Sequence, residues 1–229
     1  MFGRRRLSWS KKMCFSATAS FGLGVVLVGA GVLQLSAKRL TFSDPRFLFS
    51  CIPILFGIQQ ISEGFIWLSI TYKTWIDWKM PSLYVYLIFA QVIWPFLVPF
   101  SFFSMETDPK RKKFQSALTV IGGISSICLI FYLLFYPVHI SSSNHHLVYR
   151  LNTFNNPLII SGIYYFVPTV IPAFVSSRPR SFLFGIFVLI TYLVSKVLFP
   201  TAFISVWCYF AALLSLSIYW MLYAKKTAV

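Results

Sequence analysis

The chain has 229 residues, of which 58% are hydrophobic, 19% are aromatic and only 11% are charged. Soluble globular domains carry about 25% charged residues, so this composition excludes an ordinary soluble domain. The formal net charge is +15 at pH 7, but the basic residues are confined to segments that flank apolar runs. In that position they indicate membrane orientation and contact with anionic lipid headgroups rather than nucleic acid. We therefore predict an integral membrane protein whose partner is the lipid bilayer, with no nucleic-acid partner.

Seven apolar runs follow one another along the chain, and each is long enough to cross a bilayer as a helix. They cover 17–37, 47–71, 81–104, 114–136, 157–177, 181–199 and 203–223. No alternation of apolar and polar residues persists over successive ten-residue segments, which argues against an outer-membrane barrel. The connections are short, except for 137–156, which is long enough to carry local structure. We expect an all-α bundle of seven transmembrane helices, forming a single domain over 13–229.

Lysines and arginines are distributed unequally between the two ends of these helices. With seven spans, the first, third and fifth connections and the C-terminal tail share one side. That side holds Lys38, Arg39, Arg46, Lys110, Arg111, Lys112, Lys113, Arg178, Arg180, Lys225 and Lys226, whereas the opposite connections hold Lys73, Lys79 and Arg150. Because cytoplasmic loops carry the excess of basic residues, we expect the C-terminus in the cytoplasm and the N-terminus outside.

The N-terminal extension 1–12 conflicts with this orientation, because its basic residues would lie outside. These are Arg4, Arg5, Arg6, Lys11 and Lys12. Either the extension is a tolerated basic tail, or the native chain starts at Met13 and 1–12 is not part of it. A signal peptide is a third and weaker interpretation, because the following apolar run is long enough to span and has no clear cleavage site. We favour Met13 as the start.

The segment that begins at Met13 carries a resemblance to a known family. It runs Met13-Cys14-Phe15-Ser16-Ala17-Thr18-Ala19-Ser20-Phe21. This opening resembles that of a family of uncharacterised, mostly bacterial seven-helix membrane proteins, which begin Met-Cys-Phe-Ser-Ala-Thr-Ala-Ser. Three further stretches fit the same family, namely Phe56-Gly57-Ile58-Gln59-Gln60 with Glu63 and Trp67, Trp94-Pro95 with Pro99, and Ser205-Val206-Trp207-Cys208-Tyr209-Phe210-Ala211-Ala212. The resemblance covers nearly the whole chain from Met13 and implies no particular function. We expect the protein in the inner (cytoplasmic) membrane of a bacterium.

Glu63 is the most informative residue for function. It is one of only five acidic residues, and it lies within the apolar stretch from Phe47 to Ile70. A rise of 1.5 Å per residue places it about 10 Å below the predicted outer surface. An ionisable group at that depth costs several kcal/mol unless it is paired or hydrated, so it marks a candidate functional site.

Depth and helical spacing bring other polar residues close to Glu63. Residues 59, 63 and 67 share one helical face because they are four apart, and Gln60 lies beside that face. Cys208 lies roughly 8 Å below the same surface by the same helical rise, and Lys196 and Cys14 lie near the outer ends of their spans. The predicted ligand-binding residues are Gln59, Gln60, Glu63, Trp67, Lys196, Trp207, Cys208 and Cys14.

Each of these residues also has a purely structural interpretation. Glu63 could be a buried acid that ties helices together, either through hydrogen bonds or through an ion pair with Lys196. Lys196 could instead extend to the membrane interface. Trp67 and Trp207, taken singly, are typical of the interfacial aromatic belt. The adjacent Gln59 and Gln60 are harder to explain in this way, because lipid would penalise at least one of them, and they favour a cavity.

The cysteines and histidines indicate neither a metal nor a redox centre. Cysteines 14, 51, 128 and 208 show no Cys-x-x-Cys spacing. Cys51 and Cys128 are typical of inert packing, whereas Cys14 and Cys208 could pair in an oxidising compartment. His139, His145 and His146 all fall in the connection 137–156, where a solvated loop is a better interpretation than a metal site. We predict no metal site, and no cofactor is indicated.

Three functional classes remain after a negative search for hydrolase, P-loop and dinucleotide motifs. We favour binding or transport of a small ligand in an outward-facing polar pocket around Glu63. Prolines 95, 99, 168 and 172 support it, because they interrupt helices and leave carbonyl groups to line a pocket. The alternatives are an intramembrane enzyme that uses Glu63 as a base or Cys14 as a nucleophile, and a structural or assembly subunit.

Overall fold

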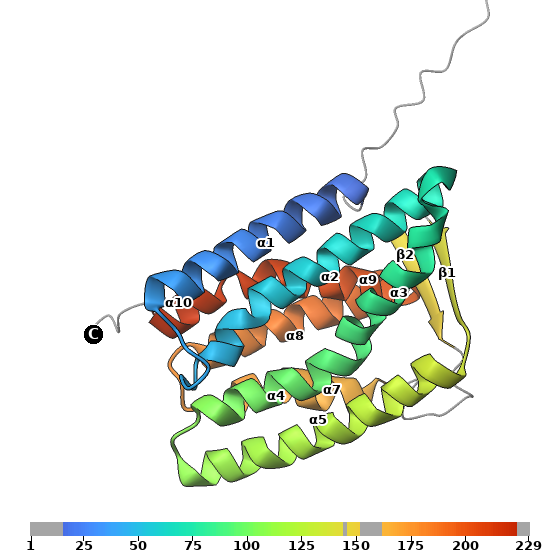
Figure 1. Ribbon diagram of the computed structural model, residues 1–229. Helices are drawn as coiled ribbons and strands as arrows, with labels where there is room; N and C mark the ends of the chain where they lie inside the picture. Colours follow the sequence, from blue (N-terminus) through green and yellow to red (C-terminus); the bar gives the residue numbers. More distant parts are fainter. Residues whose placement is uncertain (1–15, 144–145, 152–161, 224–229) are drawn as a thin grey trace, which may run out of the picture.

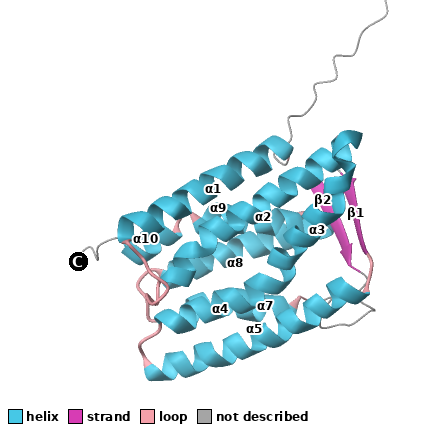
Figure 2. Cartoon of the chain, viewed as in Figure 1, coloured by secondary structure: helices cyan, strands magenta, loops and turns pink. Residues whose placement is uncertain are grey.

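The protein is an all-α bundle with one small β-hairpin, as Figures 1 and 2 show. The computed structural model describes residues 16–143, 146–151 and 162–223. Within them, six helical segments are long and apolar enough to cross a membrane, namely Ala17–Lys38, Phe47–Thr71, Lys73–Met105, Pro109–Phe135, Ser181–Leu198 and Pro200–Tyr223. A shorter apolar helix, Ile163–Val175, falls in the fifth predicted span, of which 157–161 lie outside the described residues. The prediction of an all-α membrane bundle is confirmed.

Several of these segments are built from more than one helical element. In chain order the elements are α1 (Ala17–Lys38), α2 (Phe47–Thr71), the 3-10 helix η1 (Lys73–Trp78), α3 (Lys79–Leu87), the π-helix η2 (Ile88–Ile93), α4 (Trp94–Met105), α5 (Pro109–Phe135), β1 (Val138–Ser143), β2 (His146–Leu151), α7 (Ile163–Val175), α8 (Ser181–Leu198), the 3-10 helix η3 (Pro200–Ala202), α9 (Phe203–Ser215) and α10 (Ile218–Tyr223).

The third span changes its helical geometry in the middle, where the π-helix η2 joins α3 to α4. Pro95 follows immediately, and its ring nitrogen has no hydrogen to donate to the carbonyl of Gln91. A π-helical turn before a proline absorbs this mismatch without ending the helix, and such turns are frequent at functional sites. The side chains of Ala90 and Gln91, both in this turn, border the main cavity of the protein.

The β-hairpin lies at the end of the bundle where α5 ends and η1 and α3 begin (Figure 1). Its strands are antiparallel, with Val138 opposite Leu151 and Ile140 opposite Tyr149. Leu147, Val148 and Tyr149 are all buried, and they belong to the same apolar cluster as residues of α2, α3 and α9. The connection 137–156 was expected to carry local structure, but the strands themselves were not predicted from so short a pattern.

The opposite end of the bundle gathers the basic connections. Figure 1 shows the α1–α2, α4–α5 and α7–α8 connections together at the end that also holds α10. These connections and the adjoining helix ends carry Lys38, Arg39, Arg46, Lys110, Arg111, Lys112, Lys113, Arg178 and Arg180. The grouping of these loops at one end matches the sequence analysis. The assignment of that end to the cytoplasm stays a prediction.

The buried side chain of Glu106 links two of the connections at this basic end. Its side chain is 2% exposed, and it accepts hydrogen bonds from the backbone N–H groups of Thr107 (2.9 Å), Asp108 (3.1 Å) and Ser177 (2.8 Å) and from the Ser177 hydroxyl. Burial raises the pKa of this carboxyl, but the hydrogen bonds from Ser177, Asp108 and Thr107 together outweigh burial and lower it. One carboxylate therefore joins the α4–α5 and α7–α8 connections.

Candidate functional site

The carboxyl group of Glu63 lies in a buried polar cluster between α2 and α9. Glu63 is 1% exposed, and the Ser205 hydroxyl donates a hydrogen bond of 2.5 Å to its Oε1. Its second oxygen, Oε2, accepts no hydrogen bond of normal geometry from the described residues. The side chains of Gln60 and Tyr149 nevertheless lie close enough to interact with the carboxyl. Glu63 is thus enclosed by protein with part of its hydrogen-bonding capacity unused.

The two glutamines beside Glu63 are fully buried and also incompletely satisfied. The indole Nε1 of Trp94 donates to Gln59 Oε1 at 2.8 Å, and the ring of Phe56 stacks on Trp94 with centroids 4.0 Å apart. The Gln59 Nε2 and both polar atoms of Gln60 have no hydrogen-bond partner among the described residues. Buried amide groups normally have hydrogen-bond partners, so the unsatisfied atoms of these two glutamines are unusual.

Tyr86, Tyr149 and Cys208 connect this cluster to the hairpin. Tyr86 donates to the carbonyl oxygen of Ile204 at 3.4 Å, and its ring stacks on that of Tyr149 with centroids 4.9 Å apart. The hydroxyl of Tyr149 has no hydrogen-bond partner among the described residues. Cys208 is 4% exposed and lies beside Tyr86 and Gln59. Tyr149 and Cys208 therefore have the polar cluster on one side and, on the other, the main cavity.

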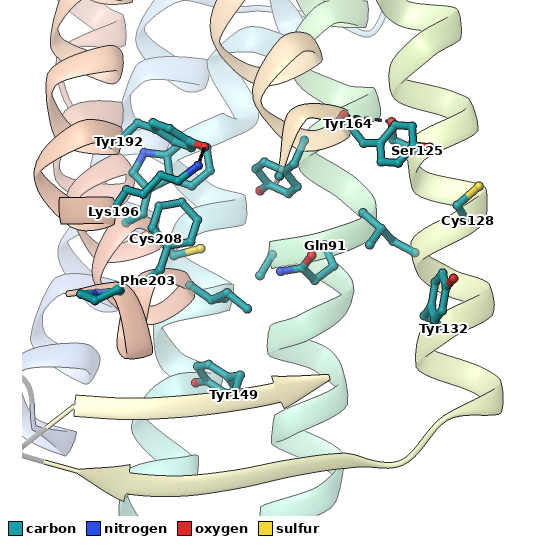
Figure 3. A pocket seen from close by; sticks show the side chains of 17 residues that line it. Gln91, Ser125, Cys128, Tyr132, Tyr149, Tyr164, Tyr192, Lys196, Phe203 and Cys208 are labelled. Carbon is teal, nitrogen blue, oxygen red and sulfur yellow. Dashed lines mark hydrogen bonds between the residues drawn. The ribbon is translucent and has the colours of Figure 1, made fainter. Parts of the chain in front are cut away.

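The main cavity has a volume of about 470 Å³ and lies between η2, α5, α7, α8, α9 and β2 (Figure 3). This volume falls within the range of small-molecule sites. Lys196 borders the cavity and donates through Nζ to the Tyr192 hydroxyl at 3.3 Å. Trp207 also borders it, is 6% exposed, and has no partner for its indole Nε1 among the described residues.

A second, smaller cavity of about 70 Å³ lies between α2, α4, α7, α8, α9 and α10. Its wall is almost entirely apolar and includes Phe49, Phe56 and Ile218. Tyr165, Trp207 and Cys208 border both cavities, so the two spaces adjoin at these side chains. The arrangement combines a larger space with polar groups in its wall and a narrow apolar extension.

The predicted site residues divide into two groups in the structure. Gln59, Gln60 and Glu63 form the polar cluster behind the wall of the main cavity, whereas Lys196, Trp207 and Cys208 border that cavity directly. Cys208 belongs to both groups, because it lies beside Gln59.

Two predicted residues fall outside these groups. Trp67 is 7% exposed and lies in the apolar cluster that also includes Ile66 and Leu83, and it does not border either cavity. Cys14 lies outside the described residues, so its proposed pairing with Cys208 does too.

No ion pair joins Glu63 to Lys196, whose ammonium group bonds to Tyr192. Among the residues that the structure describes, the one ion pair is between Arg46 and Asp44 in the α1–α2 connection, at 2.6 Å. Of the two earlier structural interpretations of Glu63, the geometry favours a hydrogen bond that ties α2 to α9 and gives no support to a buried ion pair.

The described residues contain no group of three or more histidine, cysteine, aspartate or glutamate side chains that could hold a metal ion. His139 and His146 lie on the two strands of the hairpin, and His145 is outside the described residues. The ring of His146 packs against Phe199, with centroids 4.9 Å apart.

Four residues beside the polar cluster or the main cavity were not predicted from the sequence, namely Tyr86, Gln91, Tyr149 and Ser205. Gln91 could have been recognised, because it is a polar residue in an apolar run just before Pro95. Ser205 stands three residues before Cys208, which places both on one helical face. Tyr86 and Tyr149 meet only because the hairpin folds back onto α3, which no local pattern signals.

Comparison with known protein families identifies the chain. Residues 13–229 match a family of unknown function (DUF6629), and the chain belongs to this family. No curated protein and no solved structure matches the chain.

Proposed function

We propose that this member of the family of unknown function DUF6629 binds or transports a small ligand in the main cavity, beside the polar cluster of Glu63. It is an integral membrane protein, and we place it in the inner membrane of a bacterium with the hairpin end outside. The observation that carries the proposal is a space of about 470 Å³ bordered by Trp207, whose indole Nε1 lacks a hydrogen-bond partner among the described residues.

The polar groups at the cavity wall are the strongest support. The indole Nε1 of Trp207 belongs to a side chain that is more than nine-tenths buried and borders the cavity. Tyr149 is equally buried and borders the cavity as well, with its hydroxyl beside the Glu63 carboxyl. A buried donor without a partner costs about 1–3 kcal/mol. Proteins retain such groups where a ligand or water supplies the missing bond. Few of these groups, set in a largely apolar wall, are typical of a specific small-molecule site.

The π-helix η2 supports a site at the same place. It positions Gln91 at the cavity wall (Figure 3), in the turn where Pro95 removes a backbone hydrogen-bond donor. Irregular helical turns at membrane depth are tolerated where they line a cavity or are buried in protein. The outward orientation is supported by the basic connections at the opposite end of the bundle.

A structural role for Glu63 itself has one observation in its favour. The hydrogen bond from Ser205 ties α2 to α9, across 142 positions of the chain. The enzyme alternative gains no comparable support, because Glu63 borders neither cavity and Cys14 lies outside the described residues. Ligand binding and a structural tie are compatible, since the tie supports the cavity wall.

The test is a thermal-shift screen of purified protein in detergent against a library of small soluble metabolites. We expect some compounds to raise the melting temperature of the wild type and to lose that effect with Cys128→Trp, which places an indole in the cavity. Cys128 is exposed and borders the cavity.

Ile127→Trp is the matched control, because Ile127 is 70% exposed, adjoins Cys128 on α5 and does not border the cavity. A compound that stabilises the wild type should stabilise this variant equally. If no compound distinguishes Cys128→Trp from Ile127→Trp, the cavity is not a binding site and the proposal fails.

A further inference from the structure

Two helices form a continuous track that runs from the main cavity into the apolar one. On α8, Tyr192 and Lys196 border the main cavity, and Phe184 and Val188 border the apolar one. These four residues are spaced by four, so they lie along one face of the helix. From Phe184 to Lys196 the face extends about 18 Å at the rise of an α-helix.

The facing helix α9 repeats this pattern in the opposite direction. Phe203 borders the main cavity, Trp207 borders both, and Ala211 and Ser215 border the apolar cavity. These residues are also four apart and cover about 18 Å. Because α8 and α9 are joined by a short connection and run antiparallel, the two faces line one elongated space.

The chemistry of this track changes from one end to the other. At the main-cavity end lie the ammonium of Lys196 and the indole N–H of Trp207, both hydrogen-bond donors. Among the described side chains that border the two cavities, this ammonium group carries the one charge. At the other end the wall is made of side chains such as Phe49, Ile52 and Ile218, with little polar surface. Such a space fits a molecule with an acceptor-rich, anionic head and a long apolar tail.

We propose that the ligand is a single-chain carboxylate of the fatty-acid type, a deduction that rests on the proposed function of the main cavity. The carboxylate lies at Lys196 and accepts a hydrogen bond from Trp207 Nε1. The chain passes Trp207 and Cys208 and extends along Val188 and Ala211 into the apolar cavity. Diacyl phospholipids share this head-and-chain chemistry, and the experiment distinguishes them.

The direct test uses two photoreactive analogues of palmitate with the protein in lipid nanodiscs, followed by mass spectrometry of the labelled peptides. One analogue carries a diazirine beside the carboxylate, and the other carries it at the end of the chain. We expect the first to label the peptides around Tyr192 and Phe203, and the second to label those around Phe49 and Ile218. Excess palmitate should compete with both, and an excess of anionic diacyl phospholipid should compete with neither.

Two substitutions divide the contributions of head and chain. Lys196→Met should weaken palmitate competition about tenfold, the equivalent of 1.4 kcal/mol, and leave the neutral alcohol hexadecanol unaffected. Lys196→Arg should retain binding. Ala211→Phe fills the apolar cavity and should weaken palmitate more than octanoate. The matched controls are Lys113→Met and Ala117→Phe, both at exposed positions of α5 away from the track.

The results separate this inference from the proposed function. If both analogues label lipid-facing residues such as Val25, Leu33 and Ile127 without competition, fatty-acid binding is rejected. Competition by diacyl phospholipid alone would reject the single-chain ligand in favour of a membrane lipid. In either case, a soluble compound whose effect is blocked by Cys128→Trp would preserve the proposed function while this inference fails.

Discussion

The protein buries two glutamates, and their surroundings differ sharply. Glu106, at the basic end, accepts hydrogen bonds from three backbone N–H groups and one hydroxyl. Glu63, toward the hairpin end, accepts one hydrogen bond of normal geometry from the described residues, given by Ser205. The two side chains are almost equally buried, at 2% and 1% exposed. Burial alone therefore does not distinguish the two carboxylates, whereas the number of satisfied hydrogen bonds does.

The same contrast holds for the regions around the two residues. Near Glu106, the guanidinium of Arg178 donates to the Met105 carbonyl at 3.0 Å, and Arg111 donates to the carbonyls of Val175 and Ser176. Near Glu63, by contrast, buried polar atoms of several side chains lack partners among the described residues, and a cavity adjoins them. The basic end is held together by these hydrogen bonds, whereas the proposed function assigns the unused hydrogen-bonding capacity near the hairpin end to a ligand.

The largest expected effect comes from Glu106→Ala. The substitution leaves two backbone N–H groups near α5 and the Ser177 N–H without their acceptor, and it should lower the free energy of unfolding by roughly 3 kcal/mol. The check is thermal or chemical denaturation in detergent. A loss below 1 kcal/mol would mean that water replaces the carboxylate and that the basic end is not held by it.

The stability of the wild type should also depend on pH through Glu106. Its pKa is lower in the folded protein than in the unfolded chain. The stabilisation is therefore fully present above the unfolded pKa and is lost as the pH falls through the folded pKa. We expect melting temperatures to drop on acidification and to drop less for Glu106→Gln. Parallel curves for the two proteins would contradict this.

A smaller effect should come from α5, where two neighbouring glycines differ in how closely another helix approaches them. A Cβ added at Gly122 would lie 1.9 Å from the carbonyl oxygen of Pro95, so Gly122→Ala should force α4 and α5 apart at a cost of about 2 kcal/mol. Gly123→Ala is the control, because its Cβ would meet Phe96 at an ordinary 3.7 Å. Equal stability of the two alanine variants would show that the helices are not closely packed at Pro95.

The smallest effect should come from the ion pair in the α1–α2 connection. The hydrogen bond from Arg46 is the main reason that the pKa of Asp44 is lowered to about 2, although burial opposes it. Partly exposed ion pairs contribute about 0.2–1 kcal/mol, so Asp44→Asn should be nearly neutral near pH 7 and indistinguishable from the wild type near pH 2. A loss above 2 kcal/mol, measured by denaturation at both pH values, would place this loop among the stabilising elements.

The sequence predicted the bundle well, because long apolar runs and basic flanks are direct consequences of the bilayer. It also placed Gln59 and Glu63 correctly on one face, since helical spacing is local. The hairpin escaped prediction because its buried residues, Leu147, Val148 and Tyr149, do not alternate with polar ones. The main cavity escaped too, because it depends on how α5, α7 and α8 pack at long range, and no pattern within one helix determines that.

The prediction that Glu63 pairs with Lys196 was one of two alternatives, and geometry separates them in a way that sequence does not. Both residues were expected at similar depth, but depth says nothing about which face of α8 turns toward α2. In the structure Lys196 is one turn from Tyr192 and bonds to it. Substitution of Glu63 therefore strands no cation there.

The most direct test of the contrast is a paired measurement of Glu63→Gln and Glu106→Gln in detergent, with and without a compound that stabilises the wild type. Glu63→Gln should change the free energy of unfolding by less than about 1 kcal/mol, because its amide still accepts from Ser205 and no ion pair is broken. The substitution should weaken binding of the compound about tenfold, equivalent to 1.4 kcal/mol. The reason is that Tyr149 and Cys208, which border the cavity, lie beside this polar cluster. Glu106→Gln should lower stability and leave the compound's affinity unchanged. If Glu63→Gln instead destabilises the protein as much as Glu106→Gln and leaves binding intact, Glu63 is a structural tie and the account is wrong.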